Sequence, residues 1–315
     1  MASYKLKSVY IDTSIAISSK NEIVNTDYKM NNLLYGMDNA EDAQIKMNNV
    51  ILDDLLKKCK LDLLIGSDLS NQIYITNKVL SDYHIPYLGI YNACSSYVEG
   101  LIISAAMLKL GKIKNIGVLV SSHNLTSEKT YKYPVEYGFP KKESETFTAT
   151  GAVISVVTSR ETNVKIESCT IGKVVDYNIK DSKNMGAIMA PGVVETLMDH
   201  LKDLKRDISY YDLVVTGDLG KIGKSLLEKL LIHNNIKISN YLDAGSILIK
   251  NKKLTGSGAS GPACLPLILT KKIIPEGKYK KILIIGSGSL HSKDLVNRNM
   301  SIPCISHAVS LEVSN

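Results

Sequence analysis

Short apolar runs alternate with longer helical patterns along this chain, and the alternation occurs twice. Residues 62–69 read as an apolar strand that ends in a glycine-containing turn with an acid, and a helical pattern follows. Residues 212–219 repeat this arrangement in the second half. A continuous apolar run of this length, closed by a turn, is typical of a buried strand. The pattern therefore predicts two strand–turn–helix units, with Asp68 and Asp218 in corresponding turns.

A second pair of segments follows in the same order. Residues 93–96 (Ala-Cys-Ser-Ser) begin an apolar helix expected to run to about residue 110, and Gly111 then turns the chain into a strand at 115–120. Residues 259–262 (Ala-Ser-Gly-Pro) begin a helix to about residue 272, and Gly277 leads into a strand at 281–285. With the glycines aligned, the spacings agree and Cys94 falls opposite Ser260. This favours an internal duplication over two unrelated Rossmann-like units.

The remaining pattern predicts an α/β fold in two halves, residues 1–160 and 161–315. Further strands are expected at 9–12, 152–157 and 164–166, so strands and helices alternate through both halves. Such alternation is typical of mostly parallel sheets covered by helices. The glycine- and proline-containing segment 186–192 is expected to form the main loop of the second half.

Composition excludes several classes of protein. The chain has 315 residues, is 44% hydrophobic, and carries a net charge of +7 from 38 basic and 31 acidic residues. This mild excess predicts a solvated lysine-rich surface with a slight preference for anionic ligands or membranes, and it is not a nucleic-acid signature. The five cysteines are scattered without a C-x-x-C motif, which argues against a disulfide framework or a zinc site. No signal-peptide pattern or membrane-spanning apolar run occurs, so membrane association is expected to be peripheral.

Cys94 is the main candidate for chemistry. It lies between a predicted strand at 87–91 and a long apolar helix, where backbone N–H groups and the helix dipole favour negative charge. This position can lower the pKa of a thiol and expose it as a nucleophile. A small buried residue without chemistry is an equally good interpretation of the position.

The sequence Asn-Ala-Cys-Ser-Ser at 92–96, in the first of two duplicated halves, resembles the thiolase superfamily, and in shape the β-ketoacyl-carrier-protein synthase III enzymes. The resemblance implies a thiolase-like fold in which two βαβαβαββ-type halves form a layered αβαβα core. In those enzymes the cysteine is acylated, and a histidine with an asparagine or a second histidine assists.

The turns that hold these partners depart from the enzyme pattern. They are residues 216–220 and 256–261 here, and neither contains histidine or asparagine. Asp218 is expected to be ionised at neutral pH, where it would disfavour a carbanion and fail as a neutral donor. We therefore expect no thioester condensation and no enzyme activity, with Cys94 as a degenerate nucleophile position.

A second resemblance extends over nearly the whole chain, to the stage V sporulation protein AD family. It rests on Ser-Ser-His-Asn at 121–124, Tyr-Pro-Val-Glu-Tyr-Gly at 133–138 and Ile-Pro-Cys-Ile-Ser-His-Ala at 302–308, with further matches at 66–72, 93–96, 184–191, 215–220 and 286–290. One departure is the turn before the second-half helix, where the family is usually rich in glycine and cysteine and this chain has Ser257, Ser260 and Pro262.

The resemblance implies that the chain binds dipicolinic acid (pyridine-2,6-dicarboxylate), with calcium as a possible companion and no other cofactor or metal. Helix N-termini and glycine-rich turns can hold the carboxylates of this flat dianion. The expected ligand-binding residues are Asp68, Asn71, Cys94, Ser95, His123, Asn124, Gly217, Asp218, Ser257, Ser260 and His307.

Local structural roles remain open for many of these residues. His123 can satisfy nearby backbone, Asp68 and Asp218 can cap the helices that follow them, and His307 can lock the last strand. The tyrosines at 131, 133 and 137 can cover the pocket, meet a dimer partner or pack in the core. For His84, His200, His233 and His291 the sequence gives no role beyond surface positions.

Three functions compete at this point. The first is a dipicolinate-binding protein that acts in uptake into the spore and release at germination, peripheral to the spore inner membrane and partnered by membrane proteins of the same system. The second is a docking subunit that binds no ligand. The third is a residual acyltransferase that uses Cys94. The resemblance also implies a homodimer, and no nucleic-acid partner is expected.

Overall fold

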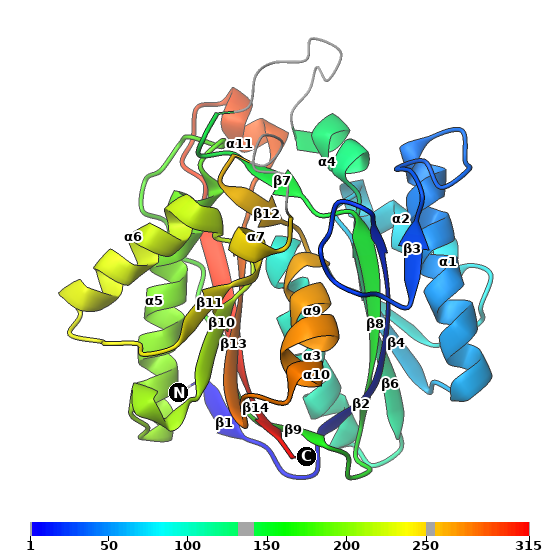
Figure 1. Ribbon diagram of the computed structural model, residues 1–315, viewed down its shortest axis with the longest axis horizontal. Coiled ribbons are helices and arrows are strands. Elements are labelled where there is room, and N and C mark those ends of the chain that lie inside the picture. Colours follow the sequence, from blue (N-terminus) through cyan, green and yellow to red (C-terminus); the bar gives the residue numbers. More distant parts are fainter. Residues whose placement is uncertain (1, 132–141, 250–255, 315) are drawn as a thin grey trace.

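A computed structural model describes residues 2–131, 142–249 and 256–314. Its main feature is a 12-stranded sheet in the order β11-β10-β13-β14-β9-β2-β8-β6-β4-β5, with β1 beside β9 and β3 beside β2. A separate pair, β12 and β7, lies at the upper end of the molecule in Figure 1. The segment 133–138, which contributes to the second resemblance, lies outside the described residues.

The strands are β1 Ser3–Lys5, β2 Tyr10–Ser19, β3 Tyr28–Met30, β4 Leu63–Ser67, β5 Tyr87–Gly89, β6 Asn115–Ser122, β7 Thr146–Thr148, β8 Gly151–Thr158, β9 Val164–Thr170, β10 Leu213–Thr216, β11 Tyr241–Asp243, β12 Gly258–Ser260, β13 Lys281–Ser289 and β14 Cys304–Val313. The α-helices are α1 Ala40–Lys58, α2 Tyr74–Leu80, α3 Ser96–Leu108, α4 Asn124–Tyr131, α5 Met185–Leu204, α6 Gly220–His233, α7 Ala244–Ile247, α9 Cys264–Ile268, α10 Ile274–Glu276 and α11 Lys293–Asn297. Short helical turns are η1 Asn71–Ile73, η2 Ala93–Ser95 and η4 Ile208–Tyr210, and η5 Leu269–Ile273 is a π-helical turn.

Along the main strand order the sheet is parallel only in its two wings, and the short β3 adds a parallel pair with β2. β4 pairs in parallel with β5 and β6, and β10 pairs in parallel with β11 and β13. Between the wings, β13, β14, β9, β2, β8 and β6 follow one another in antiparallel pairs. The expectation of a mostly parallel sheet is therefore wrong for the centre, because β8, β9 and β14 each begin at the end of the sheet where β6, β8 and β13, respectively, stop.

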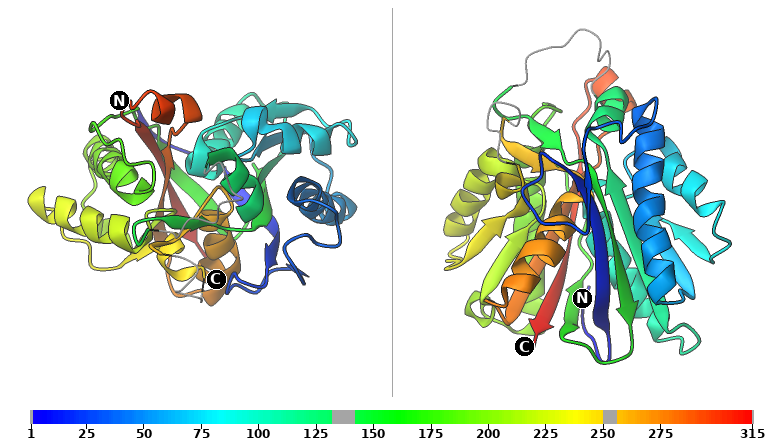
Figure 2. Two further views of the ribbon diagram at one scale, coloured as in Figure 1. Left: turned by 90° about the horizontal axis from the view of Figure 1, so that it is seen from above. Right: turned by 45° about the vertical axis from the view of Figure 1, so that its right-hand side comes forward.

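Five layers of helix and strand follow from this arrangement. Helices α5 and α6 cover one wing, α1 and α2 cover the other, and α3 lies between the wings with α9 and α10 (Figures 1 and 2). Helix α3 contacts strands of both halves, β4, β6 and β8 on one side and β13 and β14 on the other. The central helices share one large apolar core, and each outer helix layer has its own. The predicted α/β class and layered αβαβα core are confirmed.

The two halves share a pattern of hydrogen bonds from the backbone to an aspartate, in addition to their matching strands and helices. Asp62, just before β4, accepts hydrogen bonds from the N–H groups of Lys114 and Asn115. Asp212, just before β10, accepts the N–H groups of Lys280 and Lys281 in the same way. Each aspartate thus fixes the start of its strand against the neighbouring parallel strand.

Two sequence-based expectations need correction. Segment 186–192 is not a loop but the first part of α5, with Pro191 inside the helix. Its glycines serve helix packing, since a Cβ on Gly186 would lie 2.8 Å from the Cα of Gly223 in α6. Ser260 is not at a helix start but in strand β12, and the second-half helix begins at Cys264.

Within the described ranges, no helix combines the length and apolar character that a bilayer crossing requires.

Candidate functional site

Cys94 lies in η2, between β5 and the buried central helix α3. The turn that presents it is tightly held: the hydroxyl of Ser95 donates to the carbonyl of Asn92 at 2.7 Å, and that of Ser96 donates to the carbonyl of Ala93 at 2.8 Å. Ala93 adopts a left-handed conformation with φ of 48°, which is unfavourable for a residue with a side chain. Such local strain is typical of functional turns. Ser95, a predicted ligand residue, therefore has a hydroxyl that already holds this turn.

The thiol of Cys94 is buried, with only 8% of the residue exposed. Burial raises its pKa well above the ordinary value, the charge of Asp218 raises it further, and the backbone N–H groups of Gly261 and of Cys94 itself lower it. The expectation of a lowered pKa is wrong, because desolvation outweighs the donors at the helix start. The N–H groups of Gly261 and Cys94 nevertheless favour negative charge at this position.

Asp218 is the unusual group of this site. It is fully buried, and neither carboxyl oxygen has a hydrogen-bond partner that meets ordinary geometry among the described residues. Burial raises the pKa of Asp218 well above its usual value, and the nearby Asp243 raises it further, while the N–H of Gly261 lowers it slightly. Burial thus acts against the charged form that the sequence predicts for Asp218. A protonated carboxyl can donate a hydrogen bond.

Asp243, at the end of β11, holds the turn between β10 and α6 through hydrogen bonds. Its oxygens accept hydrogen bonds from the Thr216 hydroxyl at 2.8 Å and from the N–H groups of Leu219, Gly220 and Ser246 at 2.9–3.0 Å. Burial raises its pKa to about 6, against the lowering effect of these donors. The turn from β10 into α6 is thus fixed by Asp243, and Asp218 is left without a structural partner.

Asp68, the first-half counterpart of Asp218, has the opposite environment. One oxygen accepts from the N–H and hydroxyl of Ser70, and the other accepts from the N–H of Thr76 at 2.8 Å and its hydroxyl at 2.5 Å. These four donors occupy both oxygens of the carboxylate. The alternative that Asp68 has a local structural role is therefore confirmed. Asp68 is then poorly suited to bind calcium.

The predicted histidines are both engaged. In His123, Nε2 lies 2.7 Å from the carbonyl oxygen of Leu33, and Nδ1 accepts the N–H of Leu125 at 3.2 Å. In His307, Nδ1 accepts the N–H of Gly172 at 3.1 Å, and Nε2 lies 2.8 Å from the Asn92 side-chain amide. Burial lowers the pKa of His307 to about 4. Neither histidine is among the groups that act on the Cys94 thiol.

Three other predicted residues have defined places. The N–H of Asn124 donates to the Thr150 hydroxyl at 3.0 Å, at the start of α4. The Ser257 hydroxyl accepts the N–H of Ile222 and thereby caps α6. The Ser260 hydroxyl lies 2.8 Å from that of Thr146, across the β7–β12 pair.

Gly217 lies at the site itself, because its carbonyl accepts the thiol of Cys264 at 3.3 Å. Cys264 is in turn close enough to Cys94 and Asp218 for their charges to raise its pKa.

A pocket of about 720 Å³ lies beside this turn. Its lining includes Asn71, Tyr91, Lys129, Tyr131 and His291. The hydroxyls of Tyr91 and Tyr131 are hydrogen-bonded to each other, and the charge of Cys94 contributes to the raised pKa of both. The pocket lies close to the turn that carries Cys94, and both tyrosines are among the residues that line it. Asn71 is the predicted ligand residue that lines it, and Tyr131 lines it as well.

Sequence reasoning missed Gly261, Asp243 and His291. A signal existed for Asp243 and His291, since each lies at or just after the end of a strand, at the edge where Asp68 and Asp218 lie. Gly261 has φ of +112°, and a Cβ there would lie 2.8 Å from the Ser122 hydroxyl. Only glycine can bring its N–H to the thiol. His200 is buried rather than on the surface, and it bridges the hydroxyls of Thr170 and Tyr211.

The chain has the same architecture as solved structures of thiolase-like enzymes. The chain aligns with OleA from Xanthomonas campestris at a TM-score of 0.63 and 14% identity, over 99% of this chain and 100% of that one. It aligns with 3-oxoacyl-[acyl-carrier-protein] synthase III from Aquifex aeolicus at a TM-score of 0.56 and 16% identity, over 96% and 99% of the two chains. At these sequence identities the likeness establishes the thiolase-like fold and says nothing about activity.

The family follows from sequence. The family model for stage V sporulation protein AD matches residues 15–312. A Bacillus subtilis (strain 168) protein described as stage V sporulation protein AD is 32% identical over 280 residues, which is 88% of this chain and 81% of that protein. The chain belongs to the stage V sporulation protein AD family, and the predicted family is confirmed.

Proposed function

We propose that this protein binds dipicolinic acid without transforming it, at a site centred on Cys94 and Asp218. The observation that carries the proposal is the set of groups acting on the Cys94 thiol. They are the backbone N–H groups of Gly261 and Cys94, which lower the pKa of the thiol, and the buried Asp218, which raises it together with burial. A thiol in this setting stays protonated and unreactive, because acylation needs a thiolate and a base to generate it.

The same groups suit a carboxylic ligand. The N–H groups of Cys94 and Gly261 can donate to one carboxylate of the ligand, as such donors do in many anion sites. Asp218 can donate its proton to a second ligand oxygen, which would satisfy a buried group that otherwise lacks a partner. The aromatic rings of Tyr91 and Tyr131 offer apolar surface to a flat ring, and Lys129, which is paired with Glu41, also lines the pocket. Donors and aromatic surface together match a flat aromatic dianion.

Membership of a sporulation protein family suggests when the protein would bind dipicolinic acid. Family membership supports a place in spore formation, and we infer that the protein carries dipicolinate during uptake and release, as a homodimer peripheral to the spore inner membrane and next to membrane proteins of the same system. Calcium would enter as part of the cargo. No group of three His, Cys, Asp or Glu residues suitable for a metal occurs within the described ranges, so the ligand's own oxygens would hold most of the ion.

Calorimetric titration with dipicolinic acid, with and without calcium, tests the proposal. Saturable binding is expected for the wild type, and Cys94→Leu should weaken it at least tenfold by filling the space above the two N–H groups. Cys59→Leu is the matched control, because Cys59 is half-buried at the end of α1 on the far side of the sheet. Absence of binding in both conditions would overturn the ligand assignment and favour a docking subunit. Acylation of Cys94 by an acyl thioester would overturn the non-catalytic assignment.

A further inference from the structure

Positive charge is concentrated at one end of this molecule. Eight connections meet at the end where β4, β6, β10 and β13 begin: residues 6–9, 59–62, 81–86, 109–114, 159–163, 205–212, 234–240 and 277–280. We call this end the basal face. Its connections contain 11 lysine and arginine residues against 5 aspartate and glutamate residues, an excess close to the net charge of +7 of the whole chain. The basic residues are Lys7, Lys60, Lys109, Lys112, Lys114, Arg160, Lys205, Arg206, Lys237, Lys278 and Lys280.

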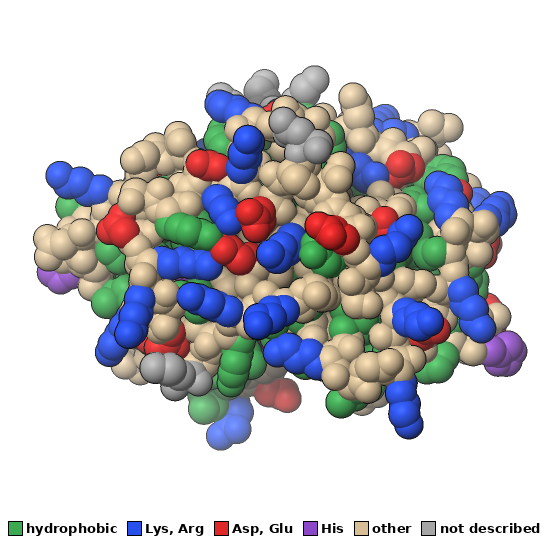
Figure 3. All heavy atoms as spheres, turned by 90° about the horizontal axis from the view of Figure 1, so that it is seen from below, with side chains coloured by type: hydrophobic (Ala, Val, Ile, Leu, Met, Phe, Trp, Pro, Cys, Tyr) green, Lys and Arg blue, Asp and Glu red, His purple; other side chains and the backbone are tan. Residues whose placement is uncertain are grey.

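The strand registers place these connections together. Asn115 at the start of β6 lies opposite Thr158 at the end of β8, and Lys281 at the start of β13 lies opposite Glu312 near the end of β14. Figure 3 shows this end of the molecule from below, with lysine and arginine side chains spread over its whole width and fewer acidic ones between them. The charge therefore forms a broad surface rather than a single pocket.

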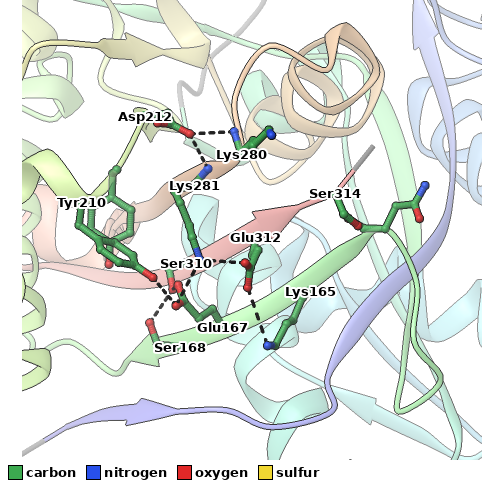
Figure 4. A network of polar contacts seen from close by, with 12 residues as sticks. Lys165, Glu167, Ser168, Tyr210, Asp212, Lys280, Lys281, Ser310, Glu312 and Ser314 are labelled. Carbon is green, nitrogen blue, oxygen red and sulfur yellow. Dashed lines mark hydrogen bonds and ion pairs between the residues drawn. The ribbon is translucent and has the colours of Figure 1, made fainter.

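An inner layer of ion pairs lies just behind the surface. Glu167 is paired with Arg206 at 2.9 Å and with Lys281 at 3.6 Å, and Glu312 is paired with Lys281 at 3.1 Å and with Lys165 at 3.8 Å (Figure 4). The strand-end acids of this region are thus neutralised internally. The exposed lysines of the connections are different: in the part of the chain that the structure describes, Lys109, Lys112, Lys114, Lys278 and Lys280 have no ion pair.

One connection adds an apolar group to this charge. Leu110, at the end of α3, is 66% exposed and lies between Lys109 and Lys112 in the sequence Lys-Leu-Gly-Lys-Ile-Lys. Ile113 in the same connection is half-buried. A solvent-exposed leucine flanked by lysines is stabilised when it enters an apolar layer while the ammonium groups stay at a charged boundary.

We propose that the basal face docks on an anionic lipid surface, with residues 109–114 at the centre of the contact. The inference deepens the membrane part of the proposed function and rests on it. A broad set of lysines suits a planar array of lipid phosphates, because many separate charges can each meet a phosphate. The exposed Leu110 favours lipid over an acidic protein segment or a free phosphate, because neither of these offers an apolar layer beneath the charge.

This docking would orient the ligand site. The Cys94 turn and the pocket lined by Asn71 and His291 follow the ends of β4, β5 and β13, at the edge of the sheet opposite the basal face. The mouth of the site would then face away from the lipid to which the protein is bound.

Vesicle co-sedimentation of the full chain tests the proposal. Wild-type protein should bind phosphatidylcholine vesicles that contain about one-third phosphatidylglycerol and should leave pure phosphatidylcholine vesicles unbound. Lys109→Gln combined with Lys112→Gln and Lys114→Gln should weaken binding about 100-fold, since each lysine at an anionic surface contributes about fivefold. Leu110→Ser should weaken binding at constant charge.

The matched control removes the same charge from the opposite end: Lys20→Gln with Lys180→Gln and Lys183→Gln. It should bind vesicles within about threefold of the wild type. Equal loss in both triple variants, or no binding of the wild type to anionic vesicles, would overturn the proposal, as would capture by an acidic protein with no binding to vesicles. Calorimetry with dipicolinic acid separates the two proposals: the basal triple variant should keep the affinity of the wild type. Vesicle binding without dipicolinate binding would overturn the ligand assignment alone.

Discussion

The two halves of this molecule place an aspartate in the same turn and give it opposite surroundings. In the first half, Asp68 accepts four hydrogen bonds from Ser70 and Thr76. In the second half, Asp218 has none among the described residues, and Asp243 from the neighbouring strand holds the turn instead. Moving the structural role to another strand leaves Asp218 free. A duplicated fold can thus keep one copy of a residue for stability and release the other for binding.

Replacing the two aspartates with alanine should give the largest difference between the halves. Asp68→Ala leaves four buried donors without an acceptor and should lower the free energy of unfolding by about 3–5 kcal/mol. Asp218→Ala removes a carboxyl that has no partner and should cost less than about 1 kcal/mol. Urea unfolding followed by circular dichroism measures both. Equal losses would show that Asp218 also has a structural role.

The pH dependence of stability should separate Asp218 from a neutral residue. The folded-state pKa of Asp218 is raised, so its contribution to stability is fully present below the ordinary pKa of an aspartate and is lost as pH rises towards the folded-state pKa. Asp218→Asn cannot ionise, so its free energy of unfolding should rise steadily relative to that of the wild type between pH 4 and pH 7. Urea unfolding across this pH range measures the difference. Asp243 is present in both proteins, so its own titration largely cancels, and parallel profiles would contradict the raised pKa.

The threonines that support the two structural aspartates should give the smallest and most similar effects. Thr76 donates its hydroxyl to Asp68, and Thr216 donates its hydroxyl to Asp243. Thr76→Val and Thr216→Val each remove one buried hydrogen bond to a carboxylate, worth about 1–3 kcal/mol, and Thr216→Val also removes the hydrogen bond between Thr216 and the Tyr241 hydroxyl. Thermal and urea unfolding should show comparable losses for the two variants, with the larger one for Thr216→Val. A loss confined to Thr76→Val would mean that Asp243 does not replace Asp68.

Much of the fold was accessible from the sequence, because it depends on local patterns repeated in order. The strand that contains Leu64 and the strand that contains Val214 were both predicted from apolar runs that end at a glycine turn. Segment 186–192 was misassigned because glycine and proline usually interrupt helices, whereas here Gly186 permits close contact with α6 and Pro191 lies within the first turns of α5.

The state of the site was harder to predict than its position. Cys94 was located by its place at a helix start, and Asp218 by the duplication. Their protonation depends on burial and on Asp243, which is brought in by a short strand that carries no strong pattern. Spacing along the chain reports which residues share an edge of a sheet, but not how many donors each carboxylate finds there.

Strand β14 sets the order in which this protein can be completed. It pairs on one side with β13 and on the other with β9, and it follows all other strands in the chain. A nascent chain that has not yet released residues 304–313 from the ribosome would hold two sheet fragments with unpaired inner edges. Such edges favour mispairing and aggregation. We therefore expect the two wings to join late, after translation of β14, and to need protection until then.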